Sequence, residues 1–284
     1  MKLDSELISL TSLIDDPDLV VRNAVRERLL QRGEEAVEQI ERFFIPDVPV
    51  SEREKYILYL EDIKAFFATN KLAELLKDPQ PMLNKALFLI TKVADTSAEE
   101  TIYFSVLESL TNEITLEISG DKTPVENIEI FNFLFFKRFG FKHSDSQLTK
   151  IGSALIDRVL LSRAGNPVTV TLSYFLLANA VGLPVYPLSF PGGFVPVYLN
   201  NDGGILFYLN IFKQGTIFLE NTLKQFFEDM GINYNPELLK IEQERSLLSI
   251  YAEFLSFIYK KNSNEQVMKR IDRVVLLIGE HKPL

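Results

Sequence analysis

From Ala164 to Asn201 the chain carries no charged residue, although charged side chains make up 24% of its 284 positions. Pro167 and Pro184 enclose the longest helix-compatible piece of this segment, which is shorter than the roughly 20 apolar residues that span a membrane. Threonine, serine and asparagine side chains interrupt that piece further. A segment without charge that is too short and too polar to cross a membrane is typical of a core. We therefore expect it to form the buried centre of a soluble protein.

The remaining composition excludes several kinds of chemistry. The chain contains no cysteine, which rules out disulfides, thiolate metal sites and cysteine nucleophiles. Its two histidines, His143 and His281, leave few ways to build a zinc or copper site, and no glycine-rich phosphate loop is present. We expect neither a metal nor a cofactor.

The charge balance and the first residues restrict the partners and the location. The 39 acidic and 30 basic side chains give a formal net charge of −9, which opposes binding to the phosphates of nucleic acids. Asp4 and Glu6 interrupt the apolar residues at the N-terminus, so the chain does not begin with the apolar core of a signal peptide. We expect a cytoplasmic protein that binds neither nucleic acid nor a membrane.

Helical spacing of apolar residues dominates both ends of the chain. The first 40 residues predict two antiparallel helices that meet at Asp15-Asp16-Pro17, a pattern similar to a HEAT repeat. One copy cannot form a solenoid, so an ordinary helical hairpin on a larger core is the favoured interpretation. Further helices are predicted over 52–77, 81–94, 97–118, 219–230, 237–260 and 264–279.

Between these helical regions the pattern changes. Thr123-Pro124-Val125-Glu126 is a capping box that starts a helix, whose aromatic run over 131–141 we expect in the core. Asn166 can cap another helix with Pro167 in its first turn, but the β-branched run 168–171 favours a strand, so this start stays open. Short apolar segments follow over 185–190, 194–200 and 205–212, the last two joined by a hairpin turn, and Gly215 is expected to end the strand region.

Three strings of this region, at 165–186, 190–198 and 206–215, together resemble the catalytic segments of the transglutaminase-like superfamily. GNPVTVTLSYFLLANAVGLPVY (165–186) is similar to the helix that begins with Gly-x-Cys and ends with Gly-Ile-Pro. FPGGFVPVY (190–198) resembles the strand that carries a histidine in Pro-Gly-His-Phe, and LFYLNIFKQG (206–215) the neighbouring strand with its aspartate. The Gly-Asn-Pro form and the flanking segments 129–142, 154–167 and 245–283 resemble the Sir-B-type branch, and the likeness covers about 80–283.

The resemblance implies an α+β fold. Its centre is a papain/transglutaminase-like core, in which a helix packs on a small antiparallel sheet, embedded in a mainly helical chain. The implied regions are a helical N-terminal part at 1–118 with the HEAT-like hairpin, a core at 119–231 and a tetratricopeptide-like helix pair at 232–284. No Gly/Ser-rich or charged linker divides the chain, so we expect one compact unit.

The triad positions that the resemblance implies hold none of the required groups. The cysteine position falls on Pro167, the histidine position on Gly193 and the aspartate position on Asn210. Acyl transfer by such a triad needs a nucleophile, a base that takes its proton and an acid that orients the base. Proline and glycine supply neither a nucleophile nor a base, and asparagine carries no charge. Triad catalysis is therefore excluded.

The leading hypothesis is a non-catalytic transglutaminase-like protein that acts as a protein- or peptide-binding or scaffolding module. If the former cleft is open, Asn166, Tyr174 and Asn210 are the candidate ligand-binding residues. If it is filled, Tyr174, Phe194 or Phe212 fills it, and the asparagines cap a helix and satisfy strand ends.

Two alternatives stay open. The first is a hydrolase or transferase that uses a displaced, non-cysteine site in the same cleft, which a hydroxyl beside a buried acid of raised pKa would favour. Candidate hydroxyls are those of Thr169, Thr171, Ser173 and Ser189, but no acid, lysine or histidine lies within the uncharged segment to activate them. We assign His143 to the surface or to a cap. The second alternative is a partner surface on the C-terminal helices, where Leu248, Ala252, Leu255 and Tyr259 form a stripe.

Overall fold

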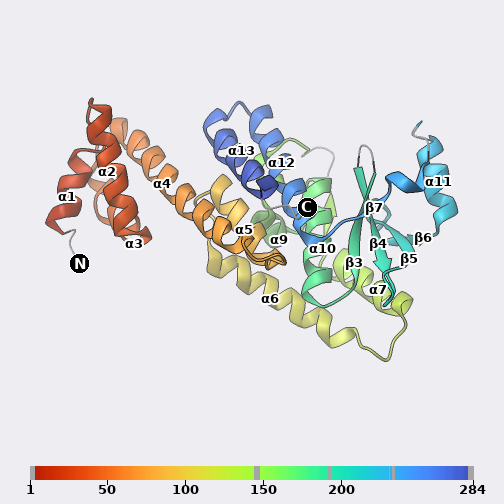
Figure 1. The fold of residues 1–284 in the computed structure, drawn as a ribbon. Coiled ribbons are helices and arrows are strands. Elements are labelled where there is room, and N and C mark those ends of the chain that lie inside the picture. The colour runs from red at the N-terminus through yellow and green to blue at the C-terminus, as the bar shows by residue number, and fades with distance from the viewer. Residues whose placement is uncertain (1–3, 144–147, 191–192, 230, 232–233, 281–284) are drawn as a thin grey trace.

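The computed structural model describes residues 4–143, 148–190, 193–229, 231 and 234–280. Helices occupy the N-terminal half, and a small sheet follows at the opposite end of the molecule from the first helices (Figure 1). Within the described residues no helix is both long and apolar enough to span a membrane.

Four helices form the N-terminal part: α1 (Ser5–Ser12), α2 (Leu19–Arg32), α3 (Glu34–Phe43) and α4 (Val50–Leu76). Asp4 and Asp18 accept backbone hydrogen bonds at the starts of α1 and α2, as helix caps do. The predicted hairpin is therefore present, and α3 follows it at once. Leu7, Leu29 and Ile40 belong to a small hydrophobic cluster that extends to the first half of α4. The second half of α4 belongs to the main core, so this helix joins the two clusters.

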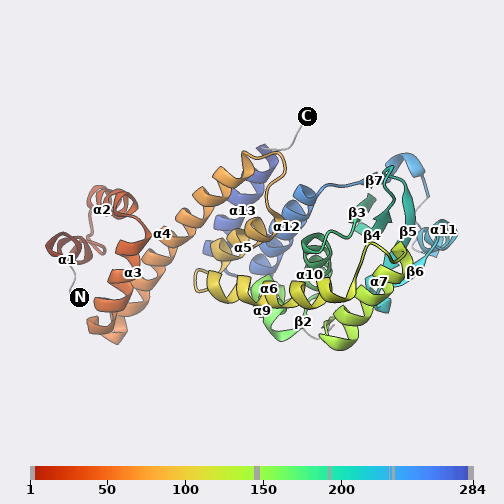
Figure 2. The same cartoon turned by 90° about the horizontal axis from the view of Figure 1, so that it is seen from below.

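The main core is built around α5. The helices that contribute to it, besides the second half of α4, are α5 (Leu83–Ala94), α6 (Glu100–Glu117), α7 (Pro124–Asn132), α8 (Ile151–Ala154), α9 (Ile156–Ser162), α10 (Pro167–Ala180), α12 (Glu244–Lys261) and α13 (Glu265–Glu280). Helices α4, α12, α13 and α9 pack on α5, which explains why nine of its twelve residues are buried. Figure 2 shows these helices between the N-terminal part at one end and the sheet at the other.

The capping box is confirmed, because Thr123 and Glu126 exchange hydrogen bonds at the start of α7. This helix continues as a π-helical turn over Phe133–Arg138. The aromatic run is only partly core: Phe131 and Phe135 are fully buried, but 59% of Phe133 is exposed to solvent. The expectation that the whole run lies in the core was therefore wrong at Phe133, the first residue of the π-helical turn, whose side chain faces solvent.

The sheet has five antiparallel strands in the order β6-β5-β4-β3-β7. They are β3 (Val185–Phe190), β4 (Gly193–Leu199), β5 (Ile205–Asn210), β6 (Thr216–Phe218) and β7 (Lys240–Ile241). Helix α10 covers one face, and α11 (Glu220–Asp229) covers the other (Figure 1). A helix on a small antiparallel sheet in a mainly helical chain confirms the α+β expectation.

Two details of the sequence prediction were wrong. Gly215 does not end the strand region, because β6 and β7 follow it. The predicted helix over 237–260 begins only at Glu244, because 237–243 holds the end of a short 3-10 helix (Pro236–Leu238) and strand β7. The open question at 168–171 resolves as helix. Asn166 caps α10 through Val168, and ten consecutive residues of that helix from Thr169 are buried, so tertiary packing overrides the β-branched preference.

The C-terminal helices α12 and α13 pack side by side. The stripe of Leu248, Ala252, Leu255 and Tyr259 lies in the main core, where none of the four side chains is more than 3% exposed. This stripe is therefore not available as a partner surface.

Candidate functional site

The three positions that the resemblance assigns to the triad, called the former triad positions below, lie at the ends of elements of the core. Pro167 is the first residue of α10, Gly193 is the first of β4 and Asn210 is the last of β5. Strand β3 starts just after the end of α10, and the hairpin with β4 brings the chain back, so the framework is that of a helix facing a sheet. The framework is present at these positions, whereas the reacting groups are not.

Position 193 faces the wrong side of the sheet for a base that would act on the start of α10. Side chains alternate along a strand. Phe194 packs towards α10, with its ring centroid 6.0 Å from that of Phe175, whereas Val195 belongs to the cluster beneath α11. Gly193 shares the face of Val195, and a Cβ added there would lie 3.1 Å from the ring of Phe190. A histidine at 193 would therefore point away from Pro167.

At the end of β5, Asn210 is fixed by hydrogen bonds from its side chain and its backbone. The Asn210 side-chain oxygen accepts a hydrogen bond from Lys213 N at 3.1 Å, and its carbonyl oxygen accepts one from Gly215 N at 2.9 Å. Asn210 is half-buried and begins the tight turn after β5, which is what an asparagine at a strand end commonly does.

Asn132 of α7 connects this turn to α10. Its Nδ2 donates to the carbonyl oxygen of Gly215 at 2.8 Å, and its Oδ1 accepts from the Tyr174 hydroxyl at 2.7 Å. Tyr174 and the Asn210 turn therefore belong to one network. Asn132 was missed by the sequence analysis; its only sequence signal is a single amide within an aromatic helix.

Tyr174 is completely buried, and burial raises the pKa of its hydroxyl well above its ordinary value. Three phenylalanine rings surround it, with centroids 4.8 to 6.0 Å away: Phe131, Phe135 and Phe136. Aromatic rings and the Asn132 amide thus occupy the space beside α10 around Tyr174. Of the side chains named as fillers, Tyr174 is completely buried, whereas 64% of Phe212 is exposed. That Tyr174 fills a former cleft stays a prediction.

Asn166 is also engaged within the protein. Its Oδ1 accepts from Val168 N at 2.9 Å, its Nδ2 donates to the Leu148 carbonyl at 2.5 Å, and only 4% of the residue is exposed. It lies eight positions before Tyr174, about 12 Å along the helix at 1.5 Å per residue. The structure therefore joins Tyr174 and Asn210 but not Asn166, and ligand contact by any of the three stays a prediction.

His143 lies much closer to the former triad positions than the sequence analysis placed it. It belongs to β1 (Lys142–His143), which pairs in parallel with β2 (Ala164–Gly165), so that His143 stands opposite Gly165. Its ring packs edge-on against Phe212, at 5.3 Å between centroids. Among the described residues, no hydroxyl or carboxylate forms a hydrogen bond with this imidazole. His281 lies outside the described residues.

A second residue that the sequence did not reveal is Glu242, which accepts hydrogen bonds from Ser189 and Ser246, both at 2.8 Å. Burial alone would raise its pKa, but the two hydroxyls and Lys240 hold the pKa of Glu242 below its ordinary value. An acid stabilised in its charged form is a poor base. The pairing therefore lacks the raised pKa that would favour a displaced enzyme site.

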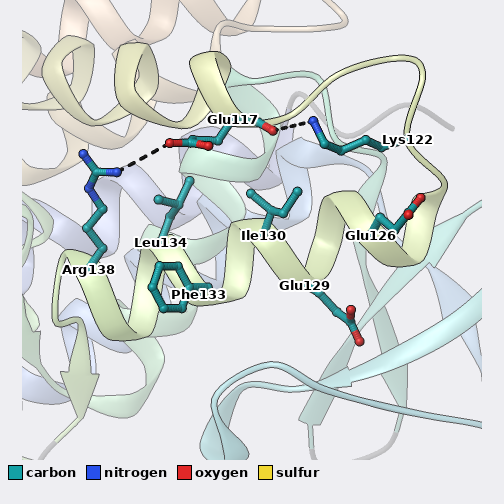
Figure 3. A pocket seen from close by; sticks show the side chains of 8 residues that line it. All are labelled: Glu117, Lys122, Glu126, Glu129, Ile130, Phe133, Leu134 and Arg138. Carbon is teal, nitrogen blue, oxygen red and sulfur yellow. Dashed lines mark hydrogen bonds and ion pairs between the residues drawn. The ribbon is translucent and has the colours of Figure 1, made fainter.

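Two hollows lie on the outer surface. One, of about 540 Å³, lies at the sheet beside the start of α11 and includes Tyr208, Glu220 and Tyr234. The other, of about 420 Å³, lies between the end of α6 and α7 (Figure 3). We call it the α6–α7 groove; its lining residues are Glu117, Lys122, Glu126, Glu129, Ile130, Phe133, Leu134 and Arg138. Across the described residues, no group of three or more histidine, aspartate or glutamate side chains could hold a metal ion.

The family model for the transglutaminase-like superfamily matches residues 102–252, which is more than half of the chain. The chain belongs to the transglutaminase-like superfamily. The matched segment begins in α6 and ends in α12, so it contains α10, the sheet and all three former triad positions. The chain contains no cysteine.

Curated relatives of this transglutaminase-like chain carry the name UPF0162 protein. The relative from Vibrio cholerae is 31% identical over 118 residues, which cover 42% of this chain and 43% of the relative. The relative from Xylella fastidiosa is 24% identical over 137 residues, or 48% of each. The chain thus spans less than half the length of these relatives. No solved structure shows a significant match.

Proposed function

We propose that this transglutaminase-like protein is a non-catalytic module that binds a protein or peptide partner in the cytoplasm. The observation that carries the proposal is the state of the three triad positions, which hold Pro167, Gly193 and Asn210. None supplies a nucleophile or a base, and the Asn210 amide oxygen caps the start of the turn after β5.

The filled space beside α10 supports an external binding surface. Both polar groups of Asn166, the Tyr174 hydroxyl and the Asn210 amide oxygen have partners within the protein. A ligand there would have to replace hydrogen bonds that already exist, which removes most of the gain from binding. The α6–α7 groove, in contrast, is open at the surface and has exposed apolar area at Phe133.

The catalytic side of the proposal is tested with the purified protein. Its hydrolysis of peptide amides and esters and its transfer of a glutamine acyl group to an amine are measured against buffer alone. We expect no turnover, and none from the variant Pro167→Cys/Gly193→His/Asn210→Asp, because the side chain at 193 meets Phe190 on the face that is turned away from α10. Turnover by the wild type that disappears in Asn210→Ala would overturn the non-catalytic assignment.

The binding side is tested by selecting displayed random 12-residue peptides on the immobilised full chain. Enrichment of a related set of peptides over an empty surface supports a peptide-binding module. If no set is enriched after repeated rounds, the binding proposal is wrong.

A further inference from the structure

The α6–α7 groove combines an apolar floor with an unusual stretch of helix. Phe133 is 59% exposed beside half-buried Ile130 and buried Leu134. Phe133 and Leu134 begin the π-helical turn, where Phe139 N bonds to Leu134 O five residues back at 2.8 Å. Such turns are rare and frequently occur at functional sites. A volume of about 420 Å³ is within the range of ligand pockets and has room for a few side chains.

Both basic side chains that line the groove, Arg138 and Lys122, already contact residues at the end of α6. The Arg138 guanidinium lies 3.2 Å from the Glu113 carboxylate and 3.6 Å from that of Glu117. The Lys122 ammonium donates to the backbone carbonyl of Glu117 at 2.9 Å. Figure 3 shows these two side chains reaching towards Glu117 from opposite ends of the groove. Neither cation is left to receive an anionic partner.

One acid of α7, Glu129, has no such partner in the described part of the chain. Glu129 is exposed, extends away from α6 in Figure 3, and has no hydrogen bond or ion pair among the described residues. Glu126 is exposed as well, and hydrogen bonds from the Thr123 backbone and hydroxyl hold its pKa below the ordinary value, so it stays ionised. From Glu113 to Arg138 the chain has five acids and three bases, a net charge of 3 − 5 = −2.

We propose that the α6–α7 groove binds a cationic amphipathic segment of a partner protein, with an apolar side chain against Phe133 and a lysine or arginine beside Glu129. The proposal rests on the binding function proposed above and assigns that function a place and a chemistry. A basic residue three or four positions from an apolar one reaches both features if the segment is helical. The charge of the groove and of the whole chain opposes an anionic partner such as nucleic acid or an acidic membrane.

The test uses the same random-peptide selection, followed by binding measurements on the enriched peptides by fluorescence anisotropy. We expect the enriched peptides to share a lysine or arginine three or four positions from leucine, isoleucine or phenylalanine. Phe133→Ser should weaken their binding at least tenfold and Glu129→Lys about fivefold, with the second effect larger at low salt. The control Leu276→Ser removes an equally exposed apolar side chain on α13 and should change the affinity less than twofold.

The outcomes separate this inference from the function on which it rests. Enriched peptides that lack basic residues, or whose affinity does not respond to Phe133→Ser and Glu129→Lys, overturn the groove assignment but leave peptide binding in place. Failure to enrich any peptide overturns both. Unchanged far-UV circular dichroism and melting temperatures establish that the variants fold, as expected for exposed positions. If Phe133→Ser has a lower melting temperature than the wild type, the affinity of Glu129→Lys alone tests the groove assignment.

Discussion

Replacing Gly215 with alanine should destabilise this protein far more than the same change at another glycine of similar conformation. Gly215 has φ +74°, and an added Cβ would lie 2.0 Å from Oδ1 of Asn132. The clash cannot be relieved without moving Asn132, which holds the turn after β5 to Tyr174. The substitution therefore tests whether this network fixes the sheet against α10.

Two contributions set the size of the effect. An alanine in the left-handed region costs roughly 1 to 2 kcal/mol. Moving the Asn132 amide also breaks its bonds to Gly215 O and to the buried Tyr174 hydroxyl, and each buried group left without a partner costs about 1 to 3 kcal/mol. We expect Gly215→Ala to lower the free energy of unfolding by about 3 to 8 kcal/mol.

Gly203 provides the matched control. It lies in the β4–β5 turn of the same sheet with φ +80°, and an added Cβ there would meet nothing within 4 Å. Gly203→Ala should therefore show only the conformational cost of about 1 to 2 kcal/mol. Urea unfolding followed by far-UV circular dichroism gives both values from the midpoints and slopes.

A double-mutant cycle with Asn132→Ala isolates the network. Once Asn132 is removed, Gly215→Ala should add only the conformational cost, so the two substitutions together should be at least about 1 to 2 kcal/mol less damaging than the sum. Equal losses for Gly215→Ala and Gly203→Ala, or simple additivity with Asn132→Ala, would refute the reasoning.

Three further outcomes follow from single contacts. Thr123→Ala removes the cap of α7 and should lower stability by about 1 kcal/mol in urea unfolding. Burial tends to raise the pKa of Asp95, but hydrogen bonds from Ser97 and the Arg158 charge hold it below its ordinary value, so its stabilising effect is present above a pH of about 4 and is lost as the pH falls. Asp95→Asn should therefore destabilise the protein at pH 7 and approach the wild type at low pH. Burial raises the pKa of Asp157, so its ionisation destabilises the folded state; Asp157→Asn should raise the melting temperature at neutral pH, and a gain that persists at pH 3 would contradict this account.

The sequence predicted those elements that are formed by interactions between residues close together in the chain. The Thr123 capping box and the Asn166 cap with Pro167 behind it both form as the residue types require. The β4–β5 hairpin follows from its Asn-Asp-Gly-Gly turn. In each case the deciding atoms lie within a few residues of one another, so a sequence window contains the whole interaction.

The environment of the former active site was not predictable in this way. His143 reaches the start of α10 through a two-residue strand, and Glu242 reaches Ser189 from 53 residues away. Such contacts are set by how the core packs, and two-residue strands leave no periodic signal. The direction of Gly193 depends on the register of one hairpin, where a shift by one residue would turn its face over.

The retained framework residues have structural reasons that do not involve catalysis. A Cβ on Gly165 would lie 2.5 Å from the Val159 side chain, and Gly215 has no room for one beside Asn132. Asn166 caps α10 and binds Leu148, which ties the start of the helix to the preceding segment. These residues would be required whether or not anything binds beside α10. Their match to the superfamily pattern therefore supports the fold, and evidence for binding has to come from exposed features that folding does not need. Phe133 is such a feature, because its exposed ring adds nothing to the core and yet lies in a groove with an unpaired carboxylate beside it.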